Sequence, residues 1–171
     1  IRDSSHASCP VVVVREDNHV TDSTKYGPVV VGVDGSEVSQ KATAYAFREA
    51  QARGAALIAV HTWMDMQVQA SLAGLSAAQS EWADIEKEQS ELLAENLKEP
   101  REEYPDVEVK QLITRDRPVS ALTEAAEGAQ LLVVGSHGRG GFKGMLLGST
   151  SRALLQSAPC PMMVVRPDED N

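Results

Sequence analysis

Apolar residues in this chain gather in short runs that are separated by longer polar stretches. Such runs, rich in valine and isoleucine, are typical of strands that are buried on both faces of a parallel sheet. A further segment, in which Val107, Val109 and Ile113 alternate with polar residues, indicates one more strand. The apolar runs are "PVVVGV" (28–33), "AALIAVHTW" (55–63), "QLLVVG" (130–135) and "PMMVV" (161–165).

Helical patterns lie between the predicted strands. Ser36 is a suitable N-cap for a helix that ends at Gly54, and the alanines on one face of this helix suit packing against a sheet. Across residues 76–98 apolar positions recur at helical spacing, and Pro100 and Pro105 are predicted to end that helix. Two further helices are expected, at about 118–127 and 149–156, and a loop is expected at 64–75.

The alternation of strands and helices predicts an α/β fold, with a doubly wound parallel sheet and helices on both faces. Ligands of such sheets bind at the carboxyl ends of the strands, where the strand order reverses. The loops that follow residues 28–33 and 130–135 are therefore the candidate binding loops.

Length and charge narrow the possible functions. The chain has 171 residues, enough for one domain with a good core and a short surplus, and its net charge of −9 is opposite in sign to that of a general nucleic-acid or anionic-membrane binder. No apolar run is long enough to span a membrane. Two cysteines that lie 151 residues apart give neither a disulfide framework nor a metal-binding spacing, and the reducing cytoplasm is the expected compartment.

The loop after residues 130–135 is rich in glycine and reads "GSHGRGGFKGMLLGSTS". Gly135 and Gly138 allow positive φ angles and close backbone approach. Gly148 and Ser149 open the next helix, so that free N–H groups and the positive end of the helix dipole face the loop and favour phosphate oxygens. The spacing is neither that of a Rossmann fingerprint nor that of a Walker A loop. The loop nevertheless predicts a phosphate site.

With these motifs, the chain from Tyr26 to Arg166 resembles a universal stress protein domain of the ATP-binding subgroup. The stretch "VVVGVDGS" is similar to the family's first strand and acidic turn. The stretch "LLVVGSHGRGGFKGMLLGSTSRALLQSAPCPMMVVR" is similar to its ATP-binding loop, last helix and last strand. The resemblance implies a five-stranded parallel sheet in the order 3-2-1-4-5, counted along the domain, and ATP with Mg²⁺ as the ligand.

The resemblance also implies a role for each matching residue. Asp34 is expected beside the ribose and phosphates or beside the metal ion of the nucleotide, and Gly135 is expected to shape the turn of the loop. The adenine is expected near the end of the second strand, from Val60 to Thr62. Arg115 departs from the family pattern, in which a glycine is common, and is expected at the rim of the pocket. The triphosphate is assigned to Gly138, Gly148, Ser149 and Thr150.

Several single residues allow two interpretations. Asp34 either contacts the nucleotide or caps the turn that follows it. Arg139, which the resemblance brings to the nucleotide, and Lys143 either meet the γ-phosphate or are solvated loop charges. His137 is interpreted as a bystander. Residues assigned to packing, or to bonds with the backbone, are His61, Trp63 and Trp82.

The chain begins with a copy of its own ending. Residues 5–17, "SHASCPVVVVRED", match residues 156–168, "QSAPCPMMVVRPD", at seven of thirteen positions. Because a universal stress protein domain ends on an edge strand, the copy is interpreted as the last strand of a preceding domain. Residues 1–24 are then the leftover strand and linker of a truncated tandem protein, and residues 25–171 are the nucleotide-binding domain. The start at Ile1 fits this interpretation.

The spare strand is predicted to cover the edge of the sheet. Residues 10–14 should pair antiparallel with residues 161–165, in the same chain or in a partner's. An antiparallel ladder keeps the two Cys-Pro starts at opposite ends, so Cys9 and Cys160 are expected to lie beyond disulfide reach. The expected protein partner is a second copy or a tandem domain, bound through the fifth strand.

The glycine loop and the resemblance together predict an ATP-binding regulatory protein whose nucleotide occupancy biases association with partners. The alternative is an ATP-consuming enzyme, either an adenylating enzyme of the PP-loop class or a hydrolase, although "VDGSEVS" lacks the paired glycines of the PP-loop motif. A third interpretation is an interaction module that has lost its nucleotide. No base that could orient a water accompanies Asp34, so hydrolysis is expected to be slow or absent.

Overall fold

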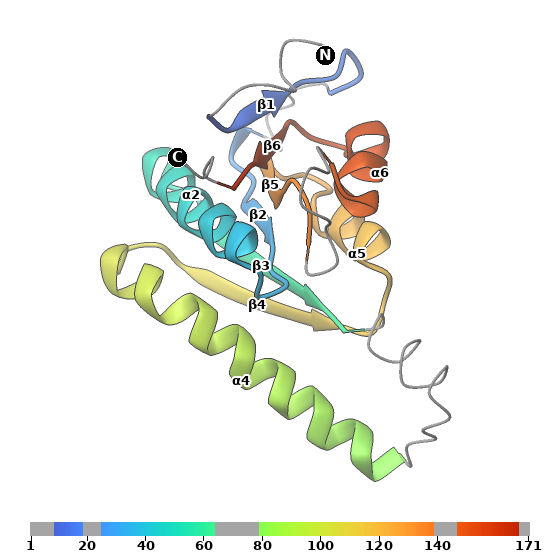
Figure 1. The fold of residues 1–171 in the computed structure, drawn as a ribbon. Coiled ribbons are helices and arrows are strands. Elements are labelled where there is room, and N and C mark those ends of the chain that lie inside the picture. The colour runs from blue at the N-terminus through green and yellow to red at the C-terminus, as the bar shows by residue number, and fades with distance from the viewer. Residues whose placement is uncertain (1–8, 19–24, 64–78, 139–146, 168–171) are drawn as a thin grey trace.

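A six-stranded sheet in the order β1-β6-β5-β2-β3-β4 carries the fold (Figure 1). The computed structural model describes residues 9–18, 25–63, 79–138 and 147–167. The strands are β1 (Val11–Val13), β2 (Val29–Gly32), β3 (Leu57–Thr62), β4 (Val109–Thr114), β5 (Leu131–Gly135) and β6 (Met162–Val165). The helices are α2 (Glu37–Arg53), α4 (Gln79–Glu103), α5 (Pro118–Ala125) and α6 (Ser149–Ser157).

The five strands from β2 to β6 run parallel, and β1 is antiparallel to its neighbour. Counted from β2 along the chain, the parallel strands lie in the order 3-2-1-4-5, which confirms the predicted topology. β2 is central, because it pairs with β3 on one side and with β5 on the other. Its residues Val29, Val30 and Val31 are fully buried, as expected for a strand covered on both faces.

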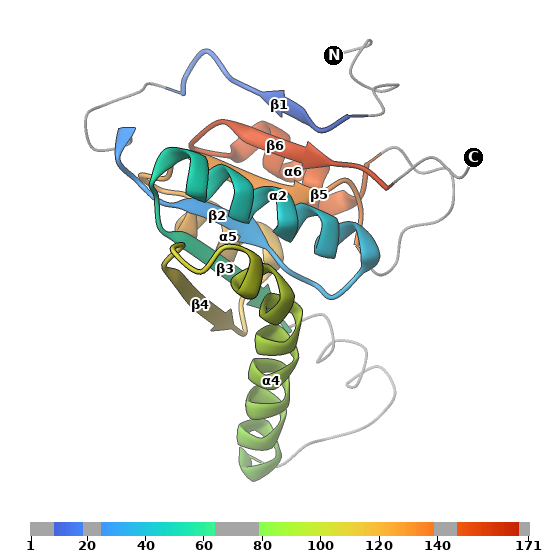
Figure 2. The same ribbon diagram turned by 90° about the vertical axis from the view of Figure 1, so that its left-hand side faces the viewer.

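Helices cover both faces of the sheet (Figures 1 and 2). α2 and α4 lie over one face, where Phe47 and Leu97 share a buried cluster with Val31. α5 and α6 lie over the other face, where Leu122 and Leu154 share a second cluster with neighbouring strand residues. None of the helices in the described part of the chain is both long and apolar enough to cross a membrane.

The ends of α2 follow the predicted capping pattern. The side chain of Ser36 accepts a hydrogen bond from the Ser39 N–H at 3.2 Å, as an N-cap does. Gly54 ends the helix in the left-handed conformation, with φ 59°. Pro118 begins α5 at its first turn, where the missing N–H costs nothing. These three local signals fix where the connections leave the sheet.

The predicted end of α4 is wrong. Pro100 lies inside the helix, which continues to Glu103. The proline removes one backbone hydrogen bond, but the helix continues past it for another turn, which closes when the Tyr104 N–H donates to the Pro100 carbonyl at 2.9 Å. Val107, predicted as part of a strand, lies in the turn before β4. The predicted loop at 64–75 and the predicted helix start at 76 lie outside the described residues.

β1 pairs with the outer edge of β6 in the same chain. Val11 lies opposite Val164, and Val13 lies opposite Met162, which confirms the predicted antiparallel ladder. The sequence repeat is thus a pair of strands that lie side by side. The assignment of residues 1–24 to a preceding domain stays a prediction.

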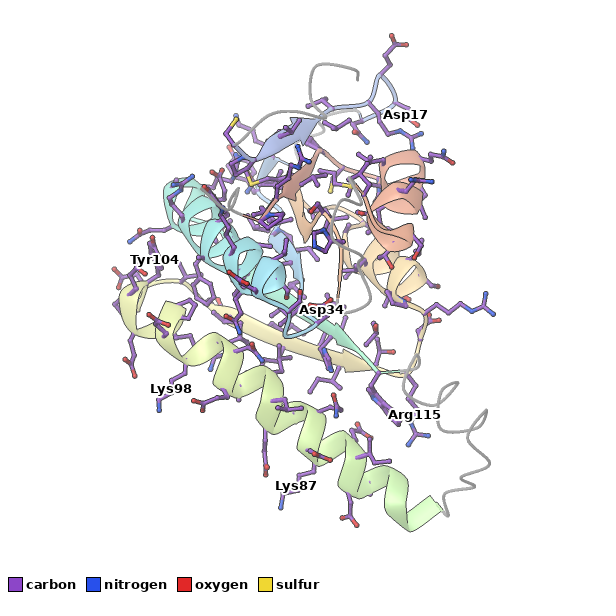
Figure 3. All side chains as sticks on the ribbon, in the orientation of Figure 1. Asp17, Asp34, Lys87, Lys98, Tyr104 and Arg115 are labelled. Carbon is purple, nitrogen blue, oxygen red and sulfur yellow. The ribbon has the colours of Figure 1, made fainter. Side chains whose placement is uncertain are left out.

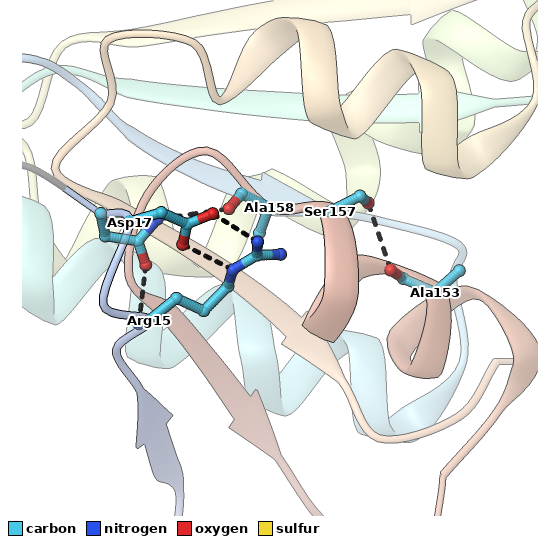
Figure 4. Close-up of polar contacts among 6 residues, drawn as sticks. Arg15, Asp17, Ala153, Ser157 and Ala158 are labelled. Carbon is cyan, nitrogen blue, oxygen red and sulfur yellow. Dashed lines mark hydrogen bonds and ion pairs between the residues drawn. The ribbon is translucent and has the colours of Figure 1, made fainter.

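The turn after β1 is held against the connection between α6 and β6 (Figure 4). Arg15 forms an ion pair with Asp17, with 2.8 Å between Nε and Oδ1. The backbone N–H of Arg15 donates to the side-chain oxygen of Asn18 at 2.9 Å, and the Asn18 amide donates to the Ala158 carbonyl at 3.3 Å. These contacts extend the attachment of β1 beyond its ladder.

The two cysteines stand at opposite ends of the ladder between β1 and β6, and both are free thiols. Cys9 is exposed, whereas the Cys160 side chain is buried in the cluster under α6. Burial raises the pKa of the Cys160 thiol from 9.0 to about 11. The stability gained by burying a neutral thiol is therefore fully present below pH 9.0 and is lost as the pH rises toward about 11.

Alkylation should separate the two thiols. In the folded protein near neutral pH, iodoacetamide is expected to modify Cys9 and to leave Cys160 unmodified, because a buried, protonated thiol is a poor nucleophile. Peptide mass spectrometry measures the modification at each site. Both cysteines should react in denaturant, and equal reaction rates in the folded protein would show that Cys160 is not buried as described.

Removal of residues 1–20 should increase self-association. The deletion takes away β1 and leaves the N–H and C=O groups of the outer β6 edge without partners, which favours pairing with another chain. Sedimentation velocity over a concentration series measures the change. As a control, Asn18→Ala removes the contact with Ala158 and keeps the ladder, so it should leave association unchanged. If the deletion variant sediments in the same way as the intact chain, this role of β1 is contradicted.

Candidate functional site

The candidate site lies at the carboxyl ends of β2 and β5, which are neighbours in the sheet. From β2 the chain crosses through α2 to β3, and from β5 it crosses through α6 to β6 on the other side. The strand order therefore reverses between these two strands, which is the place where ligands of such sheets bind. The sequence predicts this pair of loops as the binding loops, and the structure places them side by side.

Asp34 stands at the head of the turn between β2 and α2 (Figure 3). Its Oδ1 accepts hydrogen bonds from the Ser36 N–H at 2.9 Å and from the Ser36 hydroxyl at 2.6 Å. Its own N–H donates to the Ser39 hydroxyl oxygen at 3.0 Å. Gly35 has a φ of 79°, which glycine adopts without steric cost. The capping interpretation of Asp34 is thus confirmed for Oδ1.

Gly138 brings the second loop against the other carboxylate oxygen of Asp34. A Cβ atom on Gly138 would collide with Asp34 Oδ2. Gly135 is also tight, because a Cβ there would lie 3.0 Å from Val38 Cγ1 on α2. The close approach at these two glycines is confirmed, while the positive φ that glycine allows is not used at either of them. Among the described residues, the glycines with positive φ are Gly35, Gly54 and Gly128.

Ser136 ties the two ends of the glycine loop together. Its N–H donates to the Val165 carbonyl at 2.7 Å, which joins the loop to the end of β6. Its carbonyl accepts hydrogen bonds from the Gly148 N–H at 2.7 Å and from the Ser151 hydroxyl at 2.6 Å. The start of α6 is thereby held beside the end of β5. Arg139 and Lys143 belong to residues 139–146, which lie outside the described residues.

The first turn of α6 offers backbone donors at the site. Gly148 is the N-cap, and it makes no side-chain cap hydrogen bond because glycine has no side chain. Ser149 and Thr150 follow it, so their N–H groups and the positive end of the helix dipole stand beside the loop. A Cβ atom on Gly148 would lie 3.2 Å from the Cα of His137. This arrangement suits an anion such as a phosphate group.

The region predicted for the adenine is divided between core and surface. Val60 is 2% exposed and packs with Leu122 under α5, while its carbonyl accepts the Val33 N–H at 2.8 Å. Its side chain therefore belongs to the core. Thr62, at the end of β3, is half-buried and is the more accessible of the two predicted residues.

Two predictions about neighbouring side chains are confirmed. Trp63 is a packing residue, 2% exposed, and the Arg115 guanidinium lies over its ring at 4.8 Å from the centroid. His61 is buried, and its Nδ1 lies 2.7 Å from the Val33 carbonyl oxygen. The side chain of Trp82 lies outside the described residues. The bystander role of His137, whose Nδ1 lies 3.1 Å from the Ser136 hydroxyl, stays a prediction.

Three polar residues that shape the site were not singled out from the sequence. Gln89 could have been found, because it lies four residues from Ile85 and from Leu93, on the buried stripe of α4. The other two are ordinary serines in a helix start and in a loop, for which the sequence holds no distinguishing pattern: Ser39 and Ser136. The hydroxyl of Ser151, which the sequence assigns to the phosphate nest, donates instead to the Ser136 carbonyl. Within the described residues no three His, Cys, Asp or Glu side chains are grouped to hold a metal ion.

Sequence comparison identifies the family. The model of the universal stress protein family matches residues 25–166. The chain belongs to the universal stress protein family. A universal stress protein of Mycobacterium tuberculosis is 48% identical over 160 residues, which make up 94% of this chain and 52% of that protein. The chain thus spans about half the length of the curated relatives that it matches.

Solved structures of the family share the fold. A universal stress protein in complex with cAMP is 27% identical, with a TM-score of 0.56 over 82% of this chain and 96% of that chain. A universal stress protein of Archaeoglobus fulgidus in complex with dAMP is 23% identical, with a TM-score of 0.58 over 82% of this chain and 98% of that chain. The α/β sheet predicted from the sequence is therefore that of the family.

Proposed function

We propose that this domain binds an adenine nucleotide, with ATP and Mg²⁺ as the expected pair, at the carboxyl ends of β2 and β5. The observation that carries the proposal is the approach of Gly138 to Asp34, where the strand order reverses. At this place backbone donors of one loop stand beside a carboxylate of the other. Two solved members of the family, in complex with cAMP and with dAMP, support an adenine nucleotide as the ligand.

The phosphates fit the glycine side of the site. The first turn of α6 has N–H groups without a side-chain cap, and the dipole of the helix favours negative charge there. The absence of side chains at Gly138 and Gly148 lets the backbone come close to phosphate oxygens. Hydroxyl groups of Ser149 and Thr150 add donors at the same end of α6. The proposal therefore assigns the triphosphate to these four residues.

Asp34 has a different task, because a carboxylate repels phosphate. Its Oδ1 is held by Ser36, whereas its Oδ2 faces Gly138. At this oxygen it either accepts a hydrogen bond from a ribose hydroxyl or binds a Mg²⁺ ion that the phosphates also ligate. In both cases the negative charge of Asp34 is compensated, by a hydrogen-bond donor or by a cation.

We extend the proposal to regulation through the sheet edge. The glycine loop is joined to β6 by the hydrogen bond from the Ser136 N–H to the Val165 carbonyl. β6 in turn is the strand on which β1 lies, so a nucleotide that orders the loop acts on the strand next to the edge. Occupancy of the site would thereby bias association with a second copy or with a tandem domain.

Replacement of Gly138 by alanine tests the site. The new Cβ meets Asp34 Oδ2, so the carboxylate or the loop must shift from its place in the site, and the affinity for ATP should fall by about tenfold or more, equivalent to about 1.4 kcal/mol. Isothermal titration calorimetry in the presence of Mg²⁺ measures the affinity.

The matched control for this variant is Gly54→Ala at the far end of α2. Gly54 has φ 59° and open space around it, so alanine there strains the backbone by about 1–2 kcal/mol without touching the site. It should keep the affinity of the parent protein. Unchanged affinity in a folded Gly138→Ala protein would contradict the proposed site.

Turnover of ATP should be slow. In the described residues of the two loops, the titratable side chains are Asp34 and His137, and each already makes a hydrogen bond within its own loop. We expect neither to orient an attacking water, because the proposal assigns the other oxygen of Asp34 to the ribose or the metal ion and interprets His137 as a bystander. Mass spectrometry of the nucleotide that copurifies with the protein, followed by product analysis after incubation with Mg²⁺, measures identity and turnover together. A rate near the median enzyme value of about 10 s⁻¹ would favour the enzyme alternative.

A further inference from the structure

His61 lies on β3 behind the candidate site, and its ring is held from both sides. The residue is 5% exposed. Its Nδ1 lies 2.7 Å from the Val33 carbonyl oxygen, and its Nε2 lies 2.9 Å from the Gln89 side-chain oxygen on α4. We propose that His61 is a positioning residue of the nucleotide site: it holds the Val33 carbonyl, and so the turn that carries Asp34, while Gln89 fixes the orientation of the ring.

The contact with Val33 fixes one hydrogen of the ring. A backbone carbonyl only accepts hydrogen bonds, so Nδ1 of His61 carries a hydrogen and donates it to Val33. The Gln89 amide can pair with Nε2 through either its oxygen or its NH₂ group, because the two ends are interchangeable by a half-turn. Both ring nitrogens are thereby satisfied inside the protein.

The contact with Val33 acts on Asp34 through the backbone. Val33 directly precedes Asp34, and the Val33 N–H is already bound to the Val60 carbonyl at 2.8 Å. With the His61 bond, both polar backbone groups of Val33 are held by β3. Asp34, the next residue, is held by two hydroxyl groups at the start of α2, that of the N-cap Ser36 and that of Ser39. The orientation of the Asp34 carboxylate toward Gly138 thus depends on hydrogen bonds with β3 and with the start of α2.

Because His61 and Gln89 are buried, their polar groups have no water as an alternative partner. Gln89 is 2% exposed. It lies on the stripe of α4 that faces the sheet, four residues before the buried Leu93. Among the described residues, no buried side-chain nitrogen or oxygen lacks a partner. A polar pair at this depth has no water to replace a lost bond. Loss of the contact with Val33 must therefore be met by movement of the turn, whereas loss of the contact with Gln89 is met on the side of α4.

Two amide variants separate the two contacts of the ring. In His61→Asn the amide nitrogen stands close to the position of Nδ1, so the bond to Val33 is kept and the bond to Gln89 is lost. In His61→Gln the amide stands close to the position of Nε2, so the contact with Gln89 is kept and the bond to Val33 is lost. The variants carry the same chemical group and differ by one methylene.

Hydrogen exchange in the nucleotide-free protein reads the effect on the turn directly. The amides of Asp34, Ser36, Ser39 and Gln40 all donate within this turn and the start of α2. Their exchange, measured by mass spectrometry on a peptide that covers 33–40, should rise at least about fivefold in His61→Gln and stay near the parent value in His61→Asn. Equal exchange in the two variants, or parent-like exchange in His61→Gln, would overturn the positioning role.

The consequence for the ligand rests on the proposed function and is measured separately. Affinity for MgATP should fall about tenfold in His61→Gln and by less than about twofold in His61→Asn. If the parent protein does not bind ATP, the proposed function fails, and the exchange result still decides whether His61 positions the turn. If the parent binds ATP and both variants bind it equally well, the proposed function stands and the inference about His61 is wrong.

Discussion

The burial of β2 on both faces is the constraint on which the rest of the structure depends. Val29, Val30 and Val31 are fully buried, and burial of each such side chain stabilises the fold by about 1.5–3 kcal/mol. Consecutive apolar residues on a strand need a cover on either face, and α2 and α5 provide it. Crossovers to both sides make the end of β2 the point where the strand order reverses, and there Asp34 meets the loop of β5.

The candidate site is built from close contacts of backbone with side chains. Gly135 is tight against Val38, and Gly138 is tight against Asp34. In both places the glycine provides space, and its freedom of φ is not used. The loops can approach one another only because these positions lack a Cβ atom. The same contacts connect the site to the fold, since Ser136 joins the glycine loop to both α6 and β6.

The added strand changes what the sheet presents at its edge (Figure 2). β6 is entirely buried, and the edge position passes to β1, in which Val12 is 48% exposed; Val14, which follows β1, is 65% exposed. β1 resembles β6, with Val11 and Val12 in place of Met162 and Met163, so similar apolar residues form one strand inside the sheet and another at its margin. What differs is the surroundings: α2 and α6 lie over β6, and no helix of the described residues lies over the outer side of β1.

By itself the sequence determined the order of the elements, the caps of α2 and the antiparallel pairing of the repeat, because these depend on local periodicity, turn chemistry and strand likeness. The strand order was predicted only through the resemblance to the family. Tertiary structure decided the rest. It kept Pro100 inside α4, placed the Val60 side chain in the core, and brought Gln89 to His61 across 28 positions of the chain. Such contacts depend on how whole elements pack, and no local pattern of residues records the distance between side chains that meet only in the folded molecule.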